Sequence, residues 1–246
     1  MASSFVTLSE AKTRGEIIDP LPIMPAHLLV IMMKYFASIL VLCAAAFSAR
    51  GMTEQEVVNQ SAGIIRDFRH MPEQSIPATV LDEARGLAII RVLKIGFVFS
   101  GKGGQGVVVA KTGNGWSGPS FIGTGGAGFG FQAGAEVTDF VLVLNTHEAV
   151  RAFSRGGNVT IGADVSAAAG PVGRNAHAGV VPNAAIYSYS RAKGLFAGAS
   201  IEGAVIAAQR DAIRHYYGRG VTPRAILSGS VSPPDGASRL LDLLSR

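Results

Sequence analysis

The feature that most constrains the fold is the concentration of glycine in the middle of the chain. Of the 31 glycines, 24 lie between positions 86 and 203, where they alternate with short β-type segments. Such segments, split by glycine-rich turns, predict an antiparallel sheet that curls or closes into a barrel. The segments expected to form strands are 87–100, 107–111, 120–122, 136–145, 159–168, 184–191 and 195–207.

Helices are expected on both sides of these strands. Residues 54–70 carry apolar side chains at helical spacing, and Thr53 with Glu56 forms a capping-box pattern at their start. Further helices are expected at 78–85, 146–154, 209–217, 223–227 and 237–244. The predicted fold class is α+β, with a single domain over 53–246. In that domain a glycine-rich, curled or barrel-like antiparallel sheet is flanked by N- and C-terminal helices.

The first fifty residues form an N-terminal extension with the pattern of an export signal. Residues 35–47 are uncharged and mostly apolar, but they are too few to cross a bilayer of about 30 Å as a helix. Lys34 supplies a basic start, and small residues follow the apolar core, as in a cleavable signal peptide over 33–49. We therefore expect an exported protein, periplasmic or secreted. The alternative is a protein anchored to the membrane by this segment uncleaved.

The charge balance indicates an anionic partner or a basic surface without one. The net charge is +5, and residues 51–246 contain 18 basic and 14 acidic side chains. Such an excess fits a phospholipid headgroup or a nucleic acid. Nucleic acid is not expected, because the sequence has no recognised motif and no basic run, and Trp116 is its only tryptophan.

The sequence offers no pattern typical of a cofactor site. Two segments, 101–106 and 123–128, match G-x-G-x-x-G, but a dinucleotide site needs this pattern to lead from a strand into a helix. Here β-type residues follow each segment, so both are interpreted as glycine-rich turns between strands.

Catalytic and metal-binding patterns are also missing from the sequence. The histidines beyond residue 50 are scattered without metal-ligand spacing, and Cys43 is the single cysteine. Glu136 and Asp139 are three apart on an expected strand, so they should point to opposite faces instead of forming an acid/base pair. The chain is predicted to be no enzyme and to hold no metal or cofactor.

Basic residues near glycine-rich turns are the candidate lipid contacts. They are Lys102, Arg174, Arg191 and Lys193, with Phe196 beside the last two. Basic side chains next to an exposed phenylalanine suit a membrane interface, where charge meets the headgroups and the ring reaches the acyl boundary. The alternative is a packed Phe196 with solvated charges around it.

Ordered motifs of glycine, small residues and a few basic side chains run from about residue 76 to residue 244. They are ARGLAI at 84–89, GVVVA at 106–110, WSGPS at 116–120, TDFV at 138–141, AAGP at 168–171, YSYS at 187–190, KGLFAG at 193–198 and YYG at 216–218. Together they resemble the SYLF domain family, and their number and order make the resemblance specific.

The resemblance implies a non-enzymatic module that binds phosphoinositides and other anionic phospholipids. In fungal and animal members it also implies binding or bundling of actin, usually beside a Src-homology-3 or other targeting domain. The predicted function is therefore peripheral membrane association through anionic phospholipid. The alternative is an actin-binding, protein-interaction module that regulates the cytoskeleton.

Overall fold

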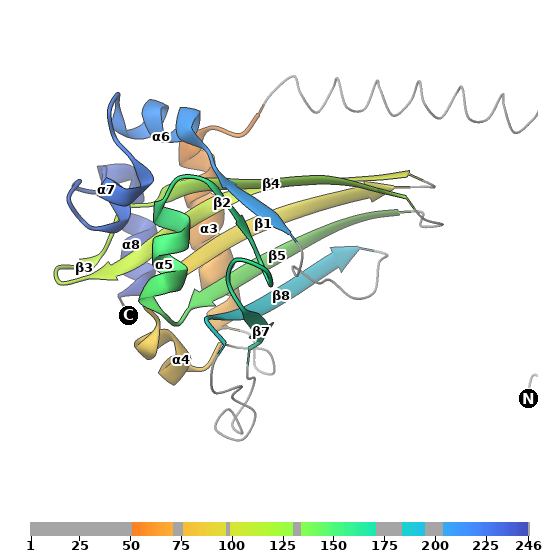
Figure 1. The fold of residues 1–246 in the computed structure, drawn as a ribbon, viewed down its shortest axis with the longest axis horizontal. Helices are drawn as coiled ribbons and strands as arrows, with labels where there is room; N and C mark the ends of the chain where they lie inside the picture. Colours follow the sequence, from red (N-terminus) through yellow and green to blue (C-terminus); the bar gives the residue numbers. More distant parts are fainter. Residues whose placement is uncertain are drawn as a thin grey trace, which may run out of the picture. The chain divides into compact units, whose positions relative to one another are not determined.

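The computed structural model describes residues 51–70, 76–96, 99–129, 134–170, 184–194 and 204–245. The signal-like segment at 33–49, Arg174 and Phe196 lie outside these residues. The chain from Met52 onward forms one compact unit. Its centre is a curled, half-barrel sheet with helices on both faces (Figure 1).

Five long strands form the middle of the sheet. They are β1 (Gly86–Gly96), β2 (Phe99–Thr112), β4 (Ser120–Phe129), β5 (Gly134–Leu144) and β8 (Ile186–Gly194). The short strands are β3 (Gly115–Trp116), β6 (Asn158–Thr160), β7 (Ala167–Ala169) and β9 (Val205–Ala208). The order is β6-β9-β4-β2-β1-β5-β8-β7, with β3 paired to β2.

The predicted α+β class with a curled sheet is confirmed, and the sheet is mixed. Most described neighbours run antiparallel, as predicted, but β7 runs parallel to β8, with Ala167 opposite Ile186. The expected strand at 159–168 is divided between β6 and β7.

The two glycine-rich segments that were interpreted as turns lie inside strands, so that interpretation was wrong. Residues 101–106 belong to β2 and residues 123–128 to β4, and the two segments pair with each other. Gly103, for example, lies opposite Gly125. Pairing of β2 with β1 on one side and with β4 on the other keeps the glycines of β2 extended.

Close approach of two backbones explains two of the glycines in β2. A Cβ atom at Gly104 would lie 2.6 Å from the carbonyl oxygen of Arg91. One at Gly106 would overlap the carbonyl oxygen of Ile89 and lie 2.7 Å from Cα of Ile90. Strands β1 and β2 can therefore come together here only without side chains.

The helices form at the predicted places. They are α3 (Glu54–Arg69), α4 (Ala78–Glu83), α5 (His147–Ser154), α6 (Arg210–Tyr217), α7 (Pro223–Leu227) and α8 (Ser238–Leu244), with a short 3₁₀ helix η1 (Asp235–Ala237). The predicted capping box is confirmed: Thr53 Oγ1 accepts from the Glu56 amide at 3.2 Å, and the Glu56 carboxylate accepts from the Thr53 amide at 2.7 Å. These bonds satisfy amides that a helix start otherwise leaves unpaired.

The sheet is buried on both faces at the end that carries the helices. Leu87 and Ile89 of β1 belong to the cluster that includes α3, α6 and α8, and Ala88 and Ile90 belong to the cluster that includes α5. A strand covered on both sides is expected to be continuously apolar. Each large buried side chain contributes about 1.5–3 kcal/mol. In Figure 1, strands β1, β2, β4 and β5 continue beyond the helices at the other end.

A partly buried charge network around Asp139 ties β1, β5 and β8 to the end of α3. Asp139 on β5 is 1% exposed and accepts from Arg91 Nε at 2.5 Å and Nη2 at 2.9 Å. Arg191 Nη2 on β8 donates to Asp139 at 2.8 Å and to Asp67 on α3 at 2.9 Å. The network joins elements that are far apart in the sequence.

The network shifts the titration of its central carboxylate. Burial of Asp139 disfavours its charged form, but the hydrogen bonds from Arg91 and Arg191 outweigh burial and hold the pKa of Asp139 below its ordinary value of 3.8. Because the pKa of Asp139 is lower in the folded state, its ion pairs stabilise the fold at pH values above 3.8. This stabilisation is lost as the pH falls through the folded-state pKa.

The variant Gly106→Ala should be strongly destabilised. Its Cβ atom would meet the β1 backbone, which cannot move aside as a flexible side chain could. We expect a loss of about 3 kcal/mol in the free energy of unfolding, measured in urea. Gly103→Ala on the same strand is the matched control, because a Cβ there meets nothing within 4 Å. Equal stabilities of the two variants would contradict the close approach.

The variant Asp139→Asn should lose about 2 kcal/mol near neutral pH, because it removes the buried carboxylate that pairs with Arg91 and leaves Arg191 with Asp67 alone. Its unfolding free energy should also fall less steeply than that of the wild type as the solution is acidified below pH 3.8. Exposed Asp242→Asn serves as the control, with a change within about 0.5 kcal/mol. Parallel acid profiles of wild type and Asp139→Asn would contradict the account.

Candidate functional site

The predicted lipid contacts do not come together in the described residues. Lys102 is exposed on β2 and Arg191 lies on β8, with β1 and β5 between them. The side chain of Arg191 is 13% exposed, and its guanidinium pairs with two carboxylates. Lys193 lies opposite Val137 of β5, but its side chain is outside the described residues. The role of these residues as membrane contacts stays a prediction.

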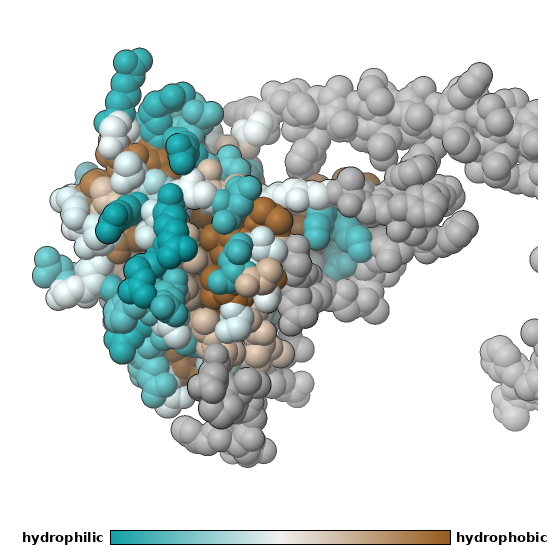
Figure 2. Space-filling view, in the orientation of Figure 1, coloured by the Kyte–Doolittle hydropathy of each residue, from teal (hydrophilic) through white to brown (hydrophobic). Residues whose placement is uncertain are grey.

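A groove that the sequence analysis did not find lies where α5, α6 and α7 meet. Its volume is about 660 Å³. The lining residues are Arg151, Ser154, Arg155, Gly156, Arg210, Ile213, Gly220, Val221, Thr222, Pro223 and Arg224, and we call this the arginine groove. Figure 2 shows hydrophilic residues gathered over α5 and α6 on this side of the molecule.

Core packing fixes the helices that form the groove. On α5, Ala149 and Phe153 are buried against the sheet, which leaves the other side of this helix to the solvent. On α6, Ile213 is buried in the other cluster. The short helix α7 reaches both clusters, with Ile226 in one and Leu227 in the other. The groove therefore lies where the two layers of the core meet.

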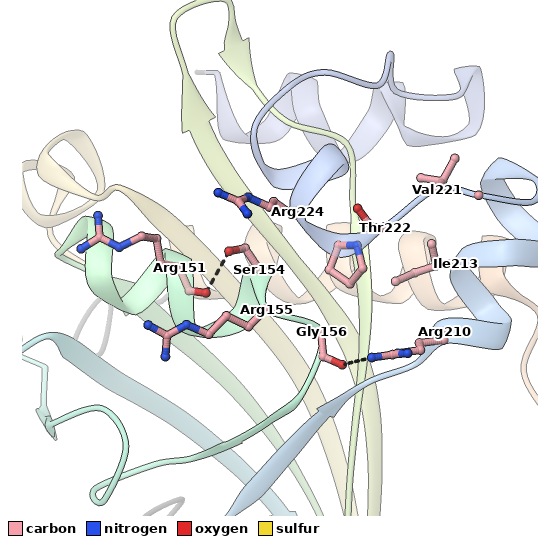
Figure 3. Close-up of a pocket in the computed structure, with 11 residues that line it drawn as sticks. Arg151, Ser154, Arg155, Gly156, Arg210, Ile213, Val221, Thr222 and Arg224 are labelled. Atoms are coloured by element: carbon pink, nitrogen blue, oxygen red, sulfur yellow. Dashed lines mark hydrogen bonds between the residues drawn. The ribbon is translucent and has the colours of Figure 1, made fainter.

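Two turns shape the walls of the groove. Helix α5 ends before Gly156, whose φ of +69° is a conformation that glycine adopts without strain. The Gly156 carbonyl oxygen accepts from Arg210 Nη2 at 3.1 Å, as Figure 3 shows. Helix α7 begins with a cap in which Thr222 Oγ1 accepts from the Ala225 amide at 3.2 Å.

The electrostatics of the arginine groove are one-sided. Its lining contains four arginines and no acidic residue. Arg151 lies 3.4 Å from Glu148 on the solvent side of α5, and Arg210 is held by Gly156. The side chains of Arg155 and Arg224 make no hydrogen bond or ion pair within the described part of the chain. Each guanidinium has five N–H donors, so most donors here are unused.

This chemistry suits binding of an anion. Guanidinium groups match carboxylate and phosphate geometry and often bind them through two parallel hydrogen bonds. Arg155 and Arg210 are 55 positions apart in the sequence, and Arg210 and Arg224 are 14 apart, which is why no local motif revealed the four arginines. The one local signal was the spacing of Arg151 and Arg155, which places both on one side of a helix.

The described residues do not assemble a catalytic or metal site. No group of three or more histidine, cysteine, aspartate or glutamate residues among them could hold a metal ion. Glu136 and Asp139 lie on opposite faces of β5, as predicted, and Glu136 accepts from Thr138 Oγ1 at 2.8 Å. In this part of the chain no helix has the length and apolar character needed to cross a membrane.

Comparison with known proteins identifies relatives of the chain. A family model described as Las17-binding protein actin regulator (Ysc84) matches residues 125–246, which include all four groove arginines. Protein YSC84 of Saccharomyces cerevisiae is 50% identical over 177 residues, 70% of this chain and 38% of that protein. SH3 domain-containing YSC84-like protein 1 of Homo sapiens is 41% identical over 193 residues, 75% of this chain and 56% of that protein.

The chain spans less than two thirds of the length of these relatives. A third relative, LAS seventeen-binding protein 3 of Saccharomyces cerevisiae, is 49% identical to this chain over 177 residues, which are 39% of that protein's length. On this evidence the chain is non-enzymatic and belongs to the Ysc84/SYLF domain family.

Proposed function

We propose that this chain is an interaction module that binds actin filaments through the arginine groove. The observation that carries the proposal is the excess of positive charge in this groove, within the segment that matches a family of actin regulators. The chain would dock its four arginines on acidic side chains that the filament repeats along its length.

The arrangement of the groove supports docking on a protein surface. Its arginines are exposed, and they stand on helices that the core holds in place. Pre-organised groups lose less conformational freedom on binding than groups on a mobile loop. A cluster of one charge sign also attracts an oppositely charged partner before contact and speeds association at low salt.

Anionic phospholipid is a second candidate partner, favoured by the end of the sheet that extends beyond the helices. Lys102 is exposed there, opposite Lys94 on β1 and Gly126 on β4, and Ile95 nearby is 45% exposed. Basic and apolar side chains together suit the headgroup region of a membrane. In this proposal Lys102 acts with Arg174, Lys193 and Phe196, as the sequence predicts.

The compartment of the native protein bears on both proposals. If the pattern at 33–49 directs export, the chain meets envelope phospholipid. If the protein stays in the cytosol of a eukaryotic cell, it meets actin. Export remains a proposal, and fractionation of native cells tests it.

Reversal of two groove charges should weaken filament binding. Arg155→Glu with Arg224→Glu removes the two arginines that have no partner among the described residues, so the fold should be unaffected. Loss of charge-assisted hydrogen bonds should reduce co-sedimentation with actin filaments about tenfold or more. Arg239→Glu on α8, outside the groove, is the matched charge control. Filament binding by the double variant at the wild-type level would refute the proposal.

Reversal of a charge at the extended end of the sheet tests the phospholipid proposal. Lys102→Glu should reduce flotation with phosphatidylserine vesicles at low salt about fivefold or more, because each basic side chain near an anionic surface contributes about 1 kcal/mol. Arg239→Glu again serves as the control. The proposal fails if the wild-type protein shows no preference for anionic over neutral vesicles.

A further inference from the structure

We propose that Asn114 is a site of spontaneous covalent modification, where the side chain cyclises onto the backbone of Gly115 and is converted to aspartate and isoaspartate. The inference goes beyond the proposed function and does not involve the arginine groove. It rests on the one Asn-Gly pair of the sequence, on the exposure of the turn that holds this pair, and on the contacts of the residue that follows.

The pair lies at the tip of the hairpin between β2 and β3. Residues 113 and 114 connect the two strands, and Thr112 lies opposite Gly115. Gly115 has a φ of +104°, and its carbonyl oxygen accepts from Thr112 Oγ1 at 2.9 Å. Gly113, Asn114 and Gly115 are exposed, and Figure 1 shows this hairpin projecting from the end of the sheet that carries the helices. Water therefore reaches both the Asn114 amide and the peptide bond that follows it.

The reaction needs only these two residues, a base and water. Once a base has removed its proton, the backbone nitrogen of Gly115 attacks Cγ of Asn114, and the new N–Cγ bond closes a five-membered ring. The Cγ–Nδ2 bond breaks, and the amide nitrogen takes up a proton and leaves as ammonia. Water then opens the ring: cleavage of the N–Cγ bond gives aspartate, and cleavage between this nitrogen and the Asn114 carbonyl carbon gives isoaspartate. The attack is favoured because the chain already holds the reacting groups together.

The following residue distinguishes Asn114 from the other asparagines of the described residues. These are Asn59, Asn145 and Asn158, which precede glutamine, threonine and valine. A side chain at that position crowds the approach of the backbone nitrogen, most of all when it is β-branched. Asn145 is also held in place, because its Nδ2 donates to the carbonyl oxygen of Ala184 at 3.0 Å. Asn114 should therefore react fastest.

Isoaspartate at position 114 would disturb the contacts between the hairpin and the end of α8. Its backbone runs through the side chain and is longer by a carbon atom, so the residues after it shift against β2. Trp116 lies opposite Lys111, whose ammonium group is 5.5 Å from the centre of the indole ring. Trp116 Nε1 also donates to the carbonyl oxygen of Leu244 at 3.0 Å. Loss of this bond should loosen α8, whereas ordinary aspartate should leave it intact.

Peptide mass spectrometry of the folded chain, incubated at mildly alkaline pH, tests the site. The peptide with Asn114 should gain the mass of deamidation at least about tenfold faster than the peptides with Asn59 and Asn158. Asn114→Gln is the matched control, because it keeps an amide before Gly115 but would have to close a larger ring, and it should gain no mass there. The same incubation in guanidinium chloride gives the rate of the unfolded chain.

Two results of this experiment would overturn the inference. One is deamidation of Asn114 in the folded chain no faster than that of Asn59. The other is a rate in the folded chain about a hundredfold or more below that in guanidinium chloride, because the fold would then protect the turn.

Tryptophan fluorescence tests the structural consequence, since Trp116 is the only tryptophan of the sequence. Its emission should shift to longer wavelength, and the guanidinium midpoint of unfolding should fall, in proportion to the isoaspartate content measured with an isoaspartyl methyltransferase. Freshly purified Asn114→Asp carries the charge without the longer backbone, so it should match the unmodified wild type. Unchanged emission and midpoint in a sample rich in isoaspartate, or an equal change in Asn114→Asp, would refute the loosening of α8.

Discussion

Burial of the central strands on both faces is the constraint on which the other features depend. Leu87 to Ile90 are all fully buried, and they alternate between the two clusters. Helices α3 and α5 must therefore lie on opposite faces of the sheet. Helix α7 contributes to both clusters through adjacent residues, Ile226 and Leu227, and so lies at their junction. The arginine groove forms at this junction because three helices with buried apolar sides meet there.

The surroundings of each arginine decide what it does in this molecule. Arg91 and Arg191 are held by Asp139, and their charges serve to join β1, β5 and β8 with α3. Arg155 and Arg224 have no such partner among the described residues and lie at a cavity. The first pair is a structural element with little charge to offer a ligand. The second pair supplies the unused donors on which recognition depends.

The arginine contacts could be predicted only in part, because residue type alone does not report the neighbours. The basic excess of the chain indicated an anionic partner, and Arg191 was selected for its place beside a glycine-rich turn. The structure pairs Arg191 with Asp67, which is 124 positions away. The four groove arginines were missed for the same reason, since α5 and α7 meet only through the folded core.

The secondary structure was more accessible to sequence reasoning where local rules apply. The capping box at Thr53 places the start of α3 correctly, because its bonds join residues three apart. The glycine-rich segment 101–106 follows a non-local rule: its residues are extended because β1 and β4 pair with it on both sides. Local glycine content favoured a turn, and strand pairing outweighed it.

Side-chain NMR of the arginine Nε–H groups tests the central claim most directly, with inorganic pyrophosphate as the probe. If the groove is the recognition site, the resonances of Arg155 and Arg224 shift on addition of the probe and saturate together. Those of Arg91 and Arg191, which are already bound by carboxylates, stay in place. Shifts of equal size at Arg239 and at the groove arginines, or no shift at Arg155 and Arg224, would contradict the account.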